Sequence, residues 1–558
     1  MNLLDRFISY ISPTAGARRL QARATLTQIA KLTGSVNSPY KAAQLSRLNG
    51  PQQKFVKEND ISQASIEHLV AQSWSLYRNN PSARKIVRNL EAKVIGKGMN
   101  PESIAVDSDG QPAVAFRARA AELWASILTG FDSRGLPGKG GLTMPGLQKL
   151  ALRSTILSGD TVYRLKPIDS EKQRAHDIPV PVALQMVDSI RLTEDASQAE
   201  IPEGSTLFRG IVLNANGERV GYLISTSKDG SSSDAKYFPV DRIGHLYIEE
   251  DIDQHRGTPW FASAIISMQD TGDLNYNVLK ASAMAACVVG TYSKPTGAAR
   301  VGLNQSTSSS DELVDSDGNT INKIQPGMLI NTGKDGQFQL MSPNQPNMNP
   351  EAFVQHLQRG TATAFPGIKS STITGDYRNS SFSSERSADN DTWPELHDVQ
   401  EWFAAGFCQP IYESVIRAGV LSGYFDGVIT VEEFQNNPGR YCRAIWQGPI
   451  ALSINPKDDA TAAKARIQTG LSSPQMECRK VNTNWRDVLN DVAEIYAVAR
   501  EKGIPEAFVN NLMGVDTTDQ LANEAAAKAA AAQKVQNGQQ AKSLEEAELM
   551  ERVVDAAA

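Results

Sequence analysis

The sequence of 558 residues predicts an α+β protein in which helical segments precede and follow one region of strands. From residue 158 to residue 250 the apolar residues alternate with a period of two, and turn signals such as NANGE separate the segments. This pattern is typical of antiparallel strands. Elsewhere the apolar spacing is helical. The length exceeds what one hydrophobic core supports, so we expect two to four structural units.

Three segments before the strands have helical spacing, namely residues 60–98, 112–130 and 146–158. A glycine-rich loop, GLPGKGGLTMPG, separates the second from the third. Glycine and proline in such density interrupt regular structure. The amino-terminal half therefore consists of short helices followed by a β-rich unit.

A long helix is predicted after the strands, at residues 258–290. Thr258 is a good N-cap, and Pro259 follows where a first turn tolerates proline. About 30 residues would span about 45 Å, which is long for a globular domain. Its second half is rich in alanine, which lets another backbone approach closely. The candidates for such contact are Ala281, Ala283, Ala285 and Ala286.

Residues 291–348 are polar and interrupted by glycine, proline and serine, which predicts an inserted module of mixed hairpins. A shorter helix starts at Asn349 and Pro350. The chain thus leaves along one helix and returns along another. The tail after residue 500 has strong helix formers and little to bury, and Ser543 with Glu546 forms a capping-box pattern.

Composition narrows the class of protein. Apolar residues make up 41% and charged residues 21%, and the formal net charge is −6. A strongly basic surface that holds nucleic acid everywhere is excluded, although a local basic patch is not. The four cysteines lie far apart without a CxxC pattern, which is typical of free thiols in a reducing compartment.

We expect a soluble intracellular protein, because no apolar run approaches the ~20 residues of a membrane span. The amino-terminal segment MNLLDRFISYISPTAGARRLQAR is amphipathic. It has no continuous apolar stretch and no cleavage signature of a secretory signal. An amphipathic helix that docks on its own protein is favoured over a transit peptide.

The stretch GDYRNSSFSSERSADND, residues 375–391, places serines beside charges, as many nucleophilic sites do. A serine nucleophile needs a base. His397 would lie over three helical turns beyond Ser384, which is too far to serve. The pattern favours Ser383 or Ser384 as a helix cap after an exposed polar loop. Pro394 should kink or restart this helix.

Other motifs of catalysis are missing from the sequence. It has no phosphate-binding loop, no GxSxG and no HExxH, and the six histidines lack metal-ligand spacing. The acidic run EEDIDQH, residues 249–255, could bind a hard cation through oxygen, but a solvated loop explains it better. We therefore predict no catalytic residue, no cofactor and no metal.

A family resemblance emerges at the same residues. The block GDYRNSSFSSERSADNDTWPELHDVQEWFAAGFCQPIYESVIRAGVLSG resembles the signature of lambda-type phage portal proteins, with Phe382 in the place of a tyrosine. YKAAQLSR, YRNNPSA, VIGKGM and LALRSTILSGD resemble earlier blocks of that family in the same order. IWQGPIALSINPKDDATAAKARIQTGLSS resembles a later one, with Asn455 where aspartate is usual. Together these blocks cover most of residues 17–505.

The resemblance implies a portal fold with a wing, a long-helix stem, a small clip and a helical crown. The segments divide as follows: 1–257 wing, 258–290 stem helix, 291–348 clip, 349–365 second stem helix, 366–382 tunnel loop, 383–500 long wing helix and helices toward the crown, and 501–558 crown and alanine-rich tail.

The resemblance also implies a role and partners. The role is a homo-oligomeric ring, usually of twelve copies, at one capsid vertex of a virion assembled in the host cytoplasm. Double-stranded DNA would pass through its channel. The terminase large subunit, a head-tail connector or adaptor, and the major capsid or scaffold protein would bind it, with no membrane involved. Two alternatives stay open, a hydrolase with a dispersed site and an oligomeric scaffold unrelated to DNA.

A channel for a polyanion must not hold it tightly, because each cation in contact with a phosphate adds a salt-dependent attraction. The loop before the 383 helix offers few cations among serines and threonines, which suits such a wall. The expected DNA-facing residues of the tunnel loop are Lys369, Ser370, Ser371, Thr372, Tyr377 and Arg378.

Overall fold

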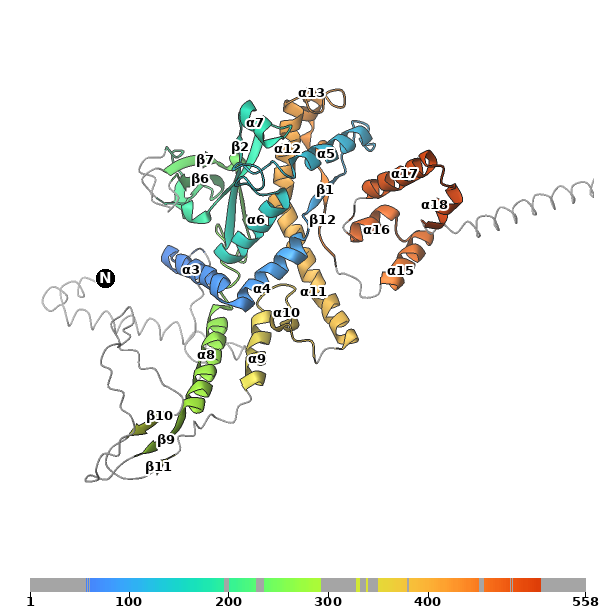
Figure 1. Cartoon of the computed structure of the whole chain (residues 1–558). Helices are drawn as coiled ribbons and strands as arrows, with labels where there is room; N and C mark the ends of the chain where they lie inside the picture. Colours follow the sequence, from blue (N-terminus) through green and yellow to red (C-terminus); the bar gives the residue numbers. More distant parts are fainter. Residues whose placement is uncertain are drawn as a thin grey trace, which may run out of the picture.

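The computed structural model describes residues 57, 59, 61–194, 200–226, 235–292, 328–331, 338–339, 350–378, 381–450, 456–481, 483 and 485–512. Helices and mainly antiparallel sheets make up this part, which confirms the predicted α+β class. Figure 1 shows a body of helices and sheets from which a pair of helices, α8 and α9, projects.

The first predicted helix is divided in two. α3 (Gln63–Asn79) ends where Asn80 leaves the helical conformation, and α4 (Pro81–Leu90) begins at the next residue. The Asn80 side chain caps α4 by accepting from the backbone N–H of Ser82 at 2.9 Å. A short π-helix, η3 (Glu91–Ile95), follows. The apolar spacing predicted the helical turns, whereas the Asn-Pro pair decided the break.

The β-rich region forms two antiparallel sheets, as predicted. One has the order β3-β2-β8 and the other the order β4-β5-β6-β7. The strands are β2 (Asp160–Pro167), β3 (Val182–Val187), β4 (Thr206–Phe208), β5 (Ile211–Leu213), β6 (Arg219–Ser225), β7 (Ala235–Pro239) and β8 (Ile243–Tyr247). A short helix, α7 (Ser170–His176), lies between β2 and β3.

Helices from distant parts of the sequence enclose the core. α5 (Val114–Ile127) and α6 (Met144–Ser158) belong to the first part of the chain. α11 (Phe382–Phe403), the π-helix η7 (Ala404–Cys408) and α12 (Gln409–Leu421) form one long rod from the second part. α13 (Val431–Asn436), α14 (Pro438–Tyr441) and β12 (Ala444–Gln447) follow, and β12 pairs with β1 (Asn100–Ser103).

The expected restart at Pro394 does not occur. Helix α11 runs through this proline without a break. Proline removes one backbone donor, but neighbouring residues of the helix are held by burial of Leu396, Val399 and Phe403. Packing of this face against the body therefore outweighs the local preference of proline.

The projecting pair consists of α8 (Ile265–Cys287) and α9 (Pro350–Ala362). The predicted start at Thr258 is wrong, because residues 260–264 form turns before α8 begins. In these turns the backbone N–H of Ala264 donates to the carbonyl of Phe261 at 2.8 Å, and the Phe261 ring is fully buried. Burial of this ring in the body fixes the turns and delays the helix.

A small sheet lies at the far end of the projecting pair (Figure 1). β9 (Val288–Tyr292) pairs in parallel with β10 (Met328–Asn331) and antiparallel with β11 (Phe338–Gln339). The sequence predicted hairpins here, and the parallel pair β9–β10 is not a hairpin. The tip of the predicted insert, NQSTSSSDELVDSDGNT, lies outside the described residues. So do residues 1–23, for which an amphipathic helix was predicted, and the tail from residue 513 with its capping-box pattern.

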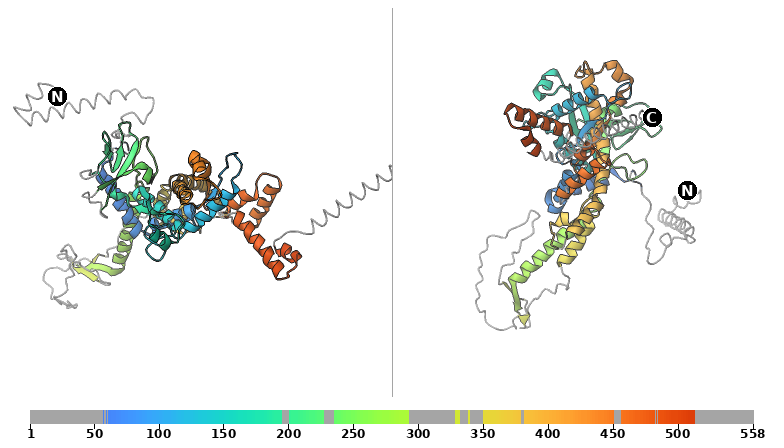
Figure 2. Two further views of the ribbon diagram at one scale, coloured as in Figure 1. Left: turned by 90° about the horizontal axis from the view of Figure 1, so that it is seen from above. Right: turned by 90° about the vertical axis from the view of Figure 1, so that its right-hand side faces the viewer.

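Four helices form the carboxy-terminal part of the described chain. They are α15 (Pro456–Gln468), α16 (Pro474–Lys480), α17 (Trp485–Glu501) and α18 (Glu506–Leu512). Figure 2 shows them beside the body, away from the projecting pair. The Trp485 indole N–H donates to the carboxylate of Glu102 at 3.2 Å, which links them to the body.

Candidate functional site

The segment between α9 and α11 carries the residues predicted to face DNA. It was expected to be an exposed loop, but it contains a short helix, α10 (Ser370–Thr374), and part of it is buried. Ile368 and Ile373 join the main core, and Thr372 is buried as well. Two isoleucines in an otherwise polar stretch are enough to fix it, because their burial favours contact with the body.

Lys369 lies against α11 rather than in solvent. Its ammonium is 2.9 Å from a carboxylate oxygen of Glu385 and 2.6 Å from one of Asp389, and its side chain is only 12% exposed. Burial acts against the charged form, but the two carboxylates outweigh it and raise the pKa of Lys369. In a single chain this cation therefore ties the segment to α11.

The start of the segment is held at Gly367. Its backbone N–H donates to the Glu395 carboxylate at 2.7 Å, and its carbonyl accepts from the Lys93 ammonium at 3.2 Å. Gly367 has a φ of +64°, and a Cβ there would lie 2.3 Å from Leu396. Only glycine fits this conformation and this space.

Arg378 and Tyr377 are the exposed part of the segment. The Arg378 side chain is 75% exposed, and it contacts Asp376 at 2.7 Å and Glu351 of α9 at 3.1 Å. Its guanidinium lowers the pKa of Asp376 to about 2. Tyr377 is 57% exposed. The far end of the segment thus reaches α9 through an ion pair that water surrounds, which is a weak bond.

A hollow of about 1140 Å³ lies between the projecting pair and α10 and α11. Its walls come from all four helices, so the segment and the projecting pair face the same space. Among the predicted residues, the walls include Lys369, Ser370, Ser371, Tyr377 and Arg378. Thr372 is not among them, since it points into the core.

The serines at the start of α11 form a cap and not a nucleophile. Ser381 is the N-cap, which corrects the expectation of Ser383 or Ser384. The Ser384 backbone N–H donates to the Ser381 side chain at 3.2 Å, and the Ser381 backbone N–H donates to the Ser384 side chain at 3.0 Å. His397 contacts Gln400 instead, at 3.2 Å. The hydroxyls are used in a reciprocal capping box.

The acidic run of residues 249–255 is held by Gln254. The Gln254 side-chain oxygen accepts from the backbone N–H groups of Glu250 at 2.7 Å and Asp251 at 3.1 Å. Among the described residues, no group of three or more His, Cys, Asp or Glu is arranged to hold a metal ion. Nor does any described helix have the length and apolarity to cross a bilayer.

The alanine-rich half of the long helix is only partly described. Ala281 is half-buried in α8. Ala283, Ala285 and Ala286 belong to the same helix, but their side chains lie outside the described part. Their role in close helix contact stays a prediction.

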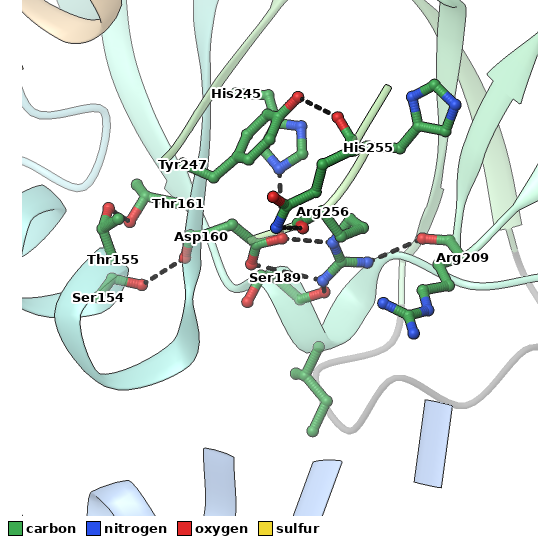
Figure 3. A network of polar contacts seen from close by, with 12 residues as sticks. Ser154, Thr155, Asp160, Thr161, Ser189, Arg209, His245, Tyr247, His255 and Arg256 are labelled. Carbon is green, nitrogen blue, oxygen red and sulfur yellow. Dashed lines mark hydrogen bonds and ion pairs between the residues drawn. The ribbon is translucent and has the colours of Figure 1, made fainter. Parts of the chain in front are cut away.

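A buried polar network in the β-rich unit was missed by sequence reasoning (Figure 3). Asp160, at the start of β2, is buried, and one of its carboxylate oxygens both contacts the Arg256 guanidinium and lies 3.2 Å from the His245 ring. Burial opposes ionisation of Asp160, but Arg256 and His245 outweigh it and lower its pKa. Burial lowers the pKa of His245, so the ring is neutral. These residues are distant in sequence, and no local signal connects them.

This network joins structural elements of the β-rich unit. Arg256 also donates to the carbonyl of Arg209 at 2.8 Å and so links β8 and its following loop to the second sheet. Figure 3 shows the side chains directed at one another inside the unit. Burial raises the pKa of the Cys442 thiol to about 12, so this cysteine is no thiolate nucleophile.

The comparisons with known proteins agree with the predicted family. The model of the family described as "Phage portal protein, lambda family" matches residues 46–400. The chain belongs to this family. The matched range ends at residue 400, so the likeness noted for residues 445–473 stays a prediction. No match is found among curated proteins.

Three solved structures are similar to the chain. "Virion of native gene transfer agent (GTA) particle" has a TM-score of 0.37 and 14% identity, over 75% of this chain and 99% of that one. "Neck of native GTA particle computed with C12 symmetry" has a TM-score of 0.36 and 13% identity, over 72% and 89%. "Neck of empty GTA particle computed with C6 symmetry" has a TM-score of 0.37 and 14% identity, over 74% and 93%.

Proposed function

We propose that this chain forms the portal ring at one vertex of a virus-like capsid and that DNA passes through the centre of the ring. Family membership supports the role. The observation that carries it is the projecting pair α8 and α9, which leads the chain out to a small sheet and back into the body. Such an excursion is explained when copies stand side by side and the pairs form the wall of a shaft.

The divisions predicted from the sequence follow this proposal. The body would be the wing, α8 and α9 the stem, the sheet β9–β11 part of the clip, and α15–α18 the start of the crown. The clip would contact the terminase large subunit during packaging and an adaptor of the head-tail connector afterwards. The wing would contact the major capsid or scaffold protein. Ring assembly in the host cytoplasm would precede incorporation into the virion, with twelve copies as in the family.

The segment from Gly367 to Ser381 would be the tunnel loop. Its exposed end with Tyr377 and Arg378 would approach DNA, whereas Lys369 would hold its base on α11. One exposed cation per copy, itself beside Asp376 and Glu351, would centre a polyanion without binding it tightly. Polar walls formed by Ser370 and Ser371 would add no apolar attachment.

The first experiment is a negative-stain image of the purified full-length chain, with its mass in solution. We expect rings with a central opening and a mass of about twelve copies, as the family resemblance implies. Particles without a central opening, or a monomer at all concentrations, would contradict the proposal.

A charge reversal then tests the channel wall. Arg378→Glu places added negative charge beside the DNA, and screening is partial within a Debye length of about 8 Å. We expect normal rings but shorter packaged DNA per particle. Arg174→Glu, on α7 away from the projecting pair (Figure 1), is the control and should package fully. Full-length packaging by Arg378→Glu would remove this residue from the wall.

A further inference from the structure

The outer face of α8 has exposed side chains at helical spacing. Tyr276 is 55% exposed and Leu279 is 70% exposed, although both are large and apolar. Residues three or four apart lie on one face of a helix. The exposed residues at this spacing are Gln269, Gly272, Asp273, Tyr276, Leu279 and Lys280. A continuous stripe of this kind is unpaired in the single chain.

The opposite face of α8 is already in contact with α9. The hydroxyls of Ser267 and Thr361 are 3.3 Å apart and mark where the two helices meet. Val278 of α8 and Val354 of α9 are half-buried beside the same hollow. The exposed stripe therefore cannot be covered by α9 of its own chain.

The outer face of α9 is exposed as well. Ala352, His356 and Arg359 lie on it at helical spacing, and Phe353 beside them is 38% exposed. This face offers small side chains and positive charge. The outer face of α8 offers large apolar side chains and the carboxylate of Asp273, and the Lys280 ammonium on it lies over the Tyr276 ring.

A glycine lies on each of these faces without a contact that explains it. A Cβ at Gly272 of α8 or at Gly360 of α9 would meet no atom within 4 Å. Glycine inside an exposed helix costs about 0.5–1 kcal/mol relative to alanine. Close approach of another helix accounts for both positions.

Asp273 on the α8 face and Arg359 on the α9 face carry opposite charges. Neither Asp273 nor Arg359 has an ion-pair partner among the described residues. Asp273 borders the side of the pair that faces α3 and α4, whereas Arg359 borders the side that faces α10. Two copies placed side by side in the same orientation bring such different faces together, and repetition of this contact closes a ring.

We propose that the outer face of α8 in one copy packs on the outer face of α9 in the next copy, with Asp273 facing Arg359 and His356. This proposal rests on the proposed function, because it assumes a ring. The occupant of the exposed α8 stripe is thus a second copy of this chain.

The contact of Ser267 with Thr361 sets the expected register. In a ring whose axis runs along the pair, neighbouring copies lie at one height. Tyr276 lies nine residues beyond Ser267, and Ala352 lies nine residues before Thr361, so they share a level. Asp273 lies at the level of His356 on α9. Side chains of a helix point toward its amino terminus, so the Arg359 side chain also leans toward this level. A large side chain thus meets a small one, and an acid meets two bases.

The test is a charge exchange in the full-length chain. Asp273→Arg and Arg359→Asp should each raise the concentration needed for half-maximal ring formation, by about three- to tenfold, because like charges then face each other. The double variant should return to within about twofold of the original protein. Glu171→Arg on the remote helix α7 is the control and should assemble normally.

Cross-linking tests the register without relying on charge. Tyr276→Cys with Ala352→Cys should give a ladder of disulfide-linked multimers under oxidation, and each single variant should give none. Two results together would contradict this contact: normal rings from both single charge variants, and no ladder from rings of the double-cysteine variant. They would not contradict the proposed ring itself. A chain that forms no ring even with its original residues would instead contradict the proposed function.

Discussion

In the body, α4 buries Ala83, Ile86, Val87 and Leu90 completely, whereas α8 leaves Ile266, Tyr276 and Leu279 in solvent. Helix α4 is strongly amphipathic, whereas the apolar residues of α8 are spread around the helix. Segments from both halves of the chain cover α4, whereas among the described residues α9 is the helix that lies along the outer part of α8. The body packs within one chain, and in the proposed ring a neighbouring copy would cover the exposed face of the projecting pair.

The largest effect is expected when an aromatic side chain is removed from the hydrophobic core of the body. Phe407 is fully buried and lies against Tyr163, with ring centres 4.8 Å apart, and against Phe403 at 5.2 Å. Phe407→Ala should lower the free energy of unfolding by about 3–5 kcal/mol, because it leaves a cavity. Urea unfolding followed by tryptophan fluorescence measures this loss.

Leu279→Ala on α8 is the matched comparison for the same measurement. In dilute, unassembled protein it should change the free energy of unfolding by less than about 0.5 kcal/mol. Equal losses for Phe407→Ala and Leu279→Ala would contradict the distinction between the two regions.

A second, smaller effect is expected where the segment after α9 meets the body. Gly367→Ala should cost about 1–3 kcal/mol, because the methyl group meets Leu396 in a backbone conformation that favours glycine. Gly375 has a similar φ of +68°, but a Cβ there would meet no atom within 4 Å. Gly375→Ala therefore measures the cost of the backbone conformation without the cost of a steric clash. Hydrogen exchange of the amides of residues 368–374 reports both variants, and equal exchange in the two would show that Leu396 is irrelevant.

The cap of α11 should have a more local effect. Ser381→Ala removes the acceptor of the Ser384 N–H and should cost about 0.5–2 kcal/mol in the first turn. Hydrogen exchange should accelerate for the first turn of α11 and stay unchanged near Phe403. Ser387→Ala, an exposed position one turn further, serves as the control, and an equal response there would argue against the capping box.

The smallest expected effect is a loss of stability at acidic pH. Burial lowers the pKa of His245, so the folded chain binds its proton less readily than the unfolded chain does. Stability is therefore complete above the ordinary value of about 6.5 and falls as the pH drops below it. The melting temperature should decrease from pH 7.5 to pH 5.5, and His245→Asn should reduce that decrease. An unchanged decrease would mean that other groups cause it.

Local patterns determined the secondary structure and the family of this protein. The period of two between residues 158 and 250 predicted antiparallel strands, because alternate side chains face opposite sides of a sheet. The long helix, the polar insert and the shorter helix predicted that the chain leaves along one helix and returns along another, as α8 and α9 do. The ordered blocks around Gly375–Tyr377 led to the portal family, and the family model confirms it.

Only the tertiary structure decided which polar residues meet. Lys369 reaches Glu385 and Asp389 across a turn, Lys93 reaches Gly367, and Asp160 reaches His245 and Arg256. The sequence could not show that Ile368 and Ile373 are buried, or that Ser381 rather than Ser383 or Ser384 caps α11. Apolar period and capping preference act over a few residues and can be read along the chain. Ion pairs and burial depend on which distant segments the core brings together, so they exist only once the body has folded.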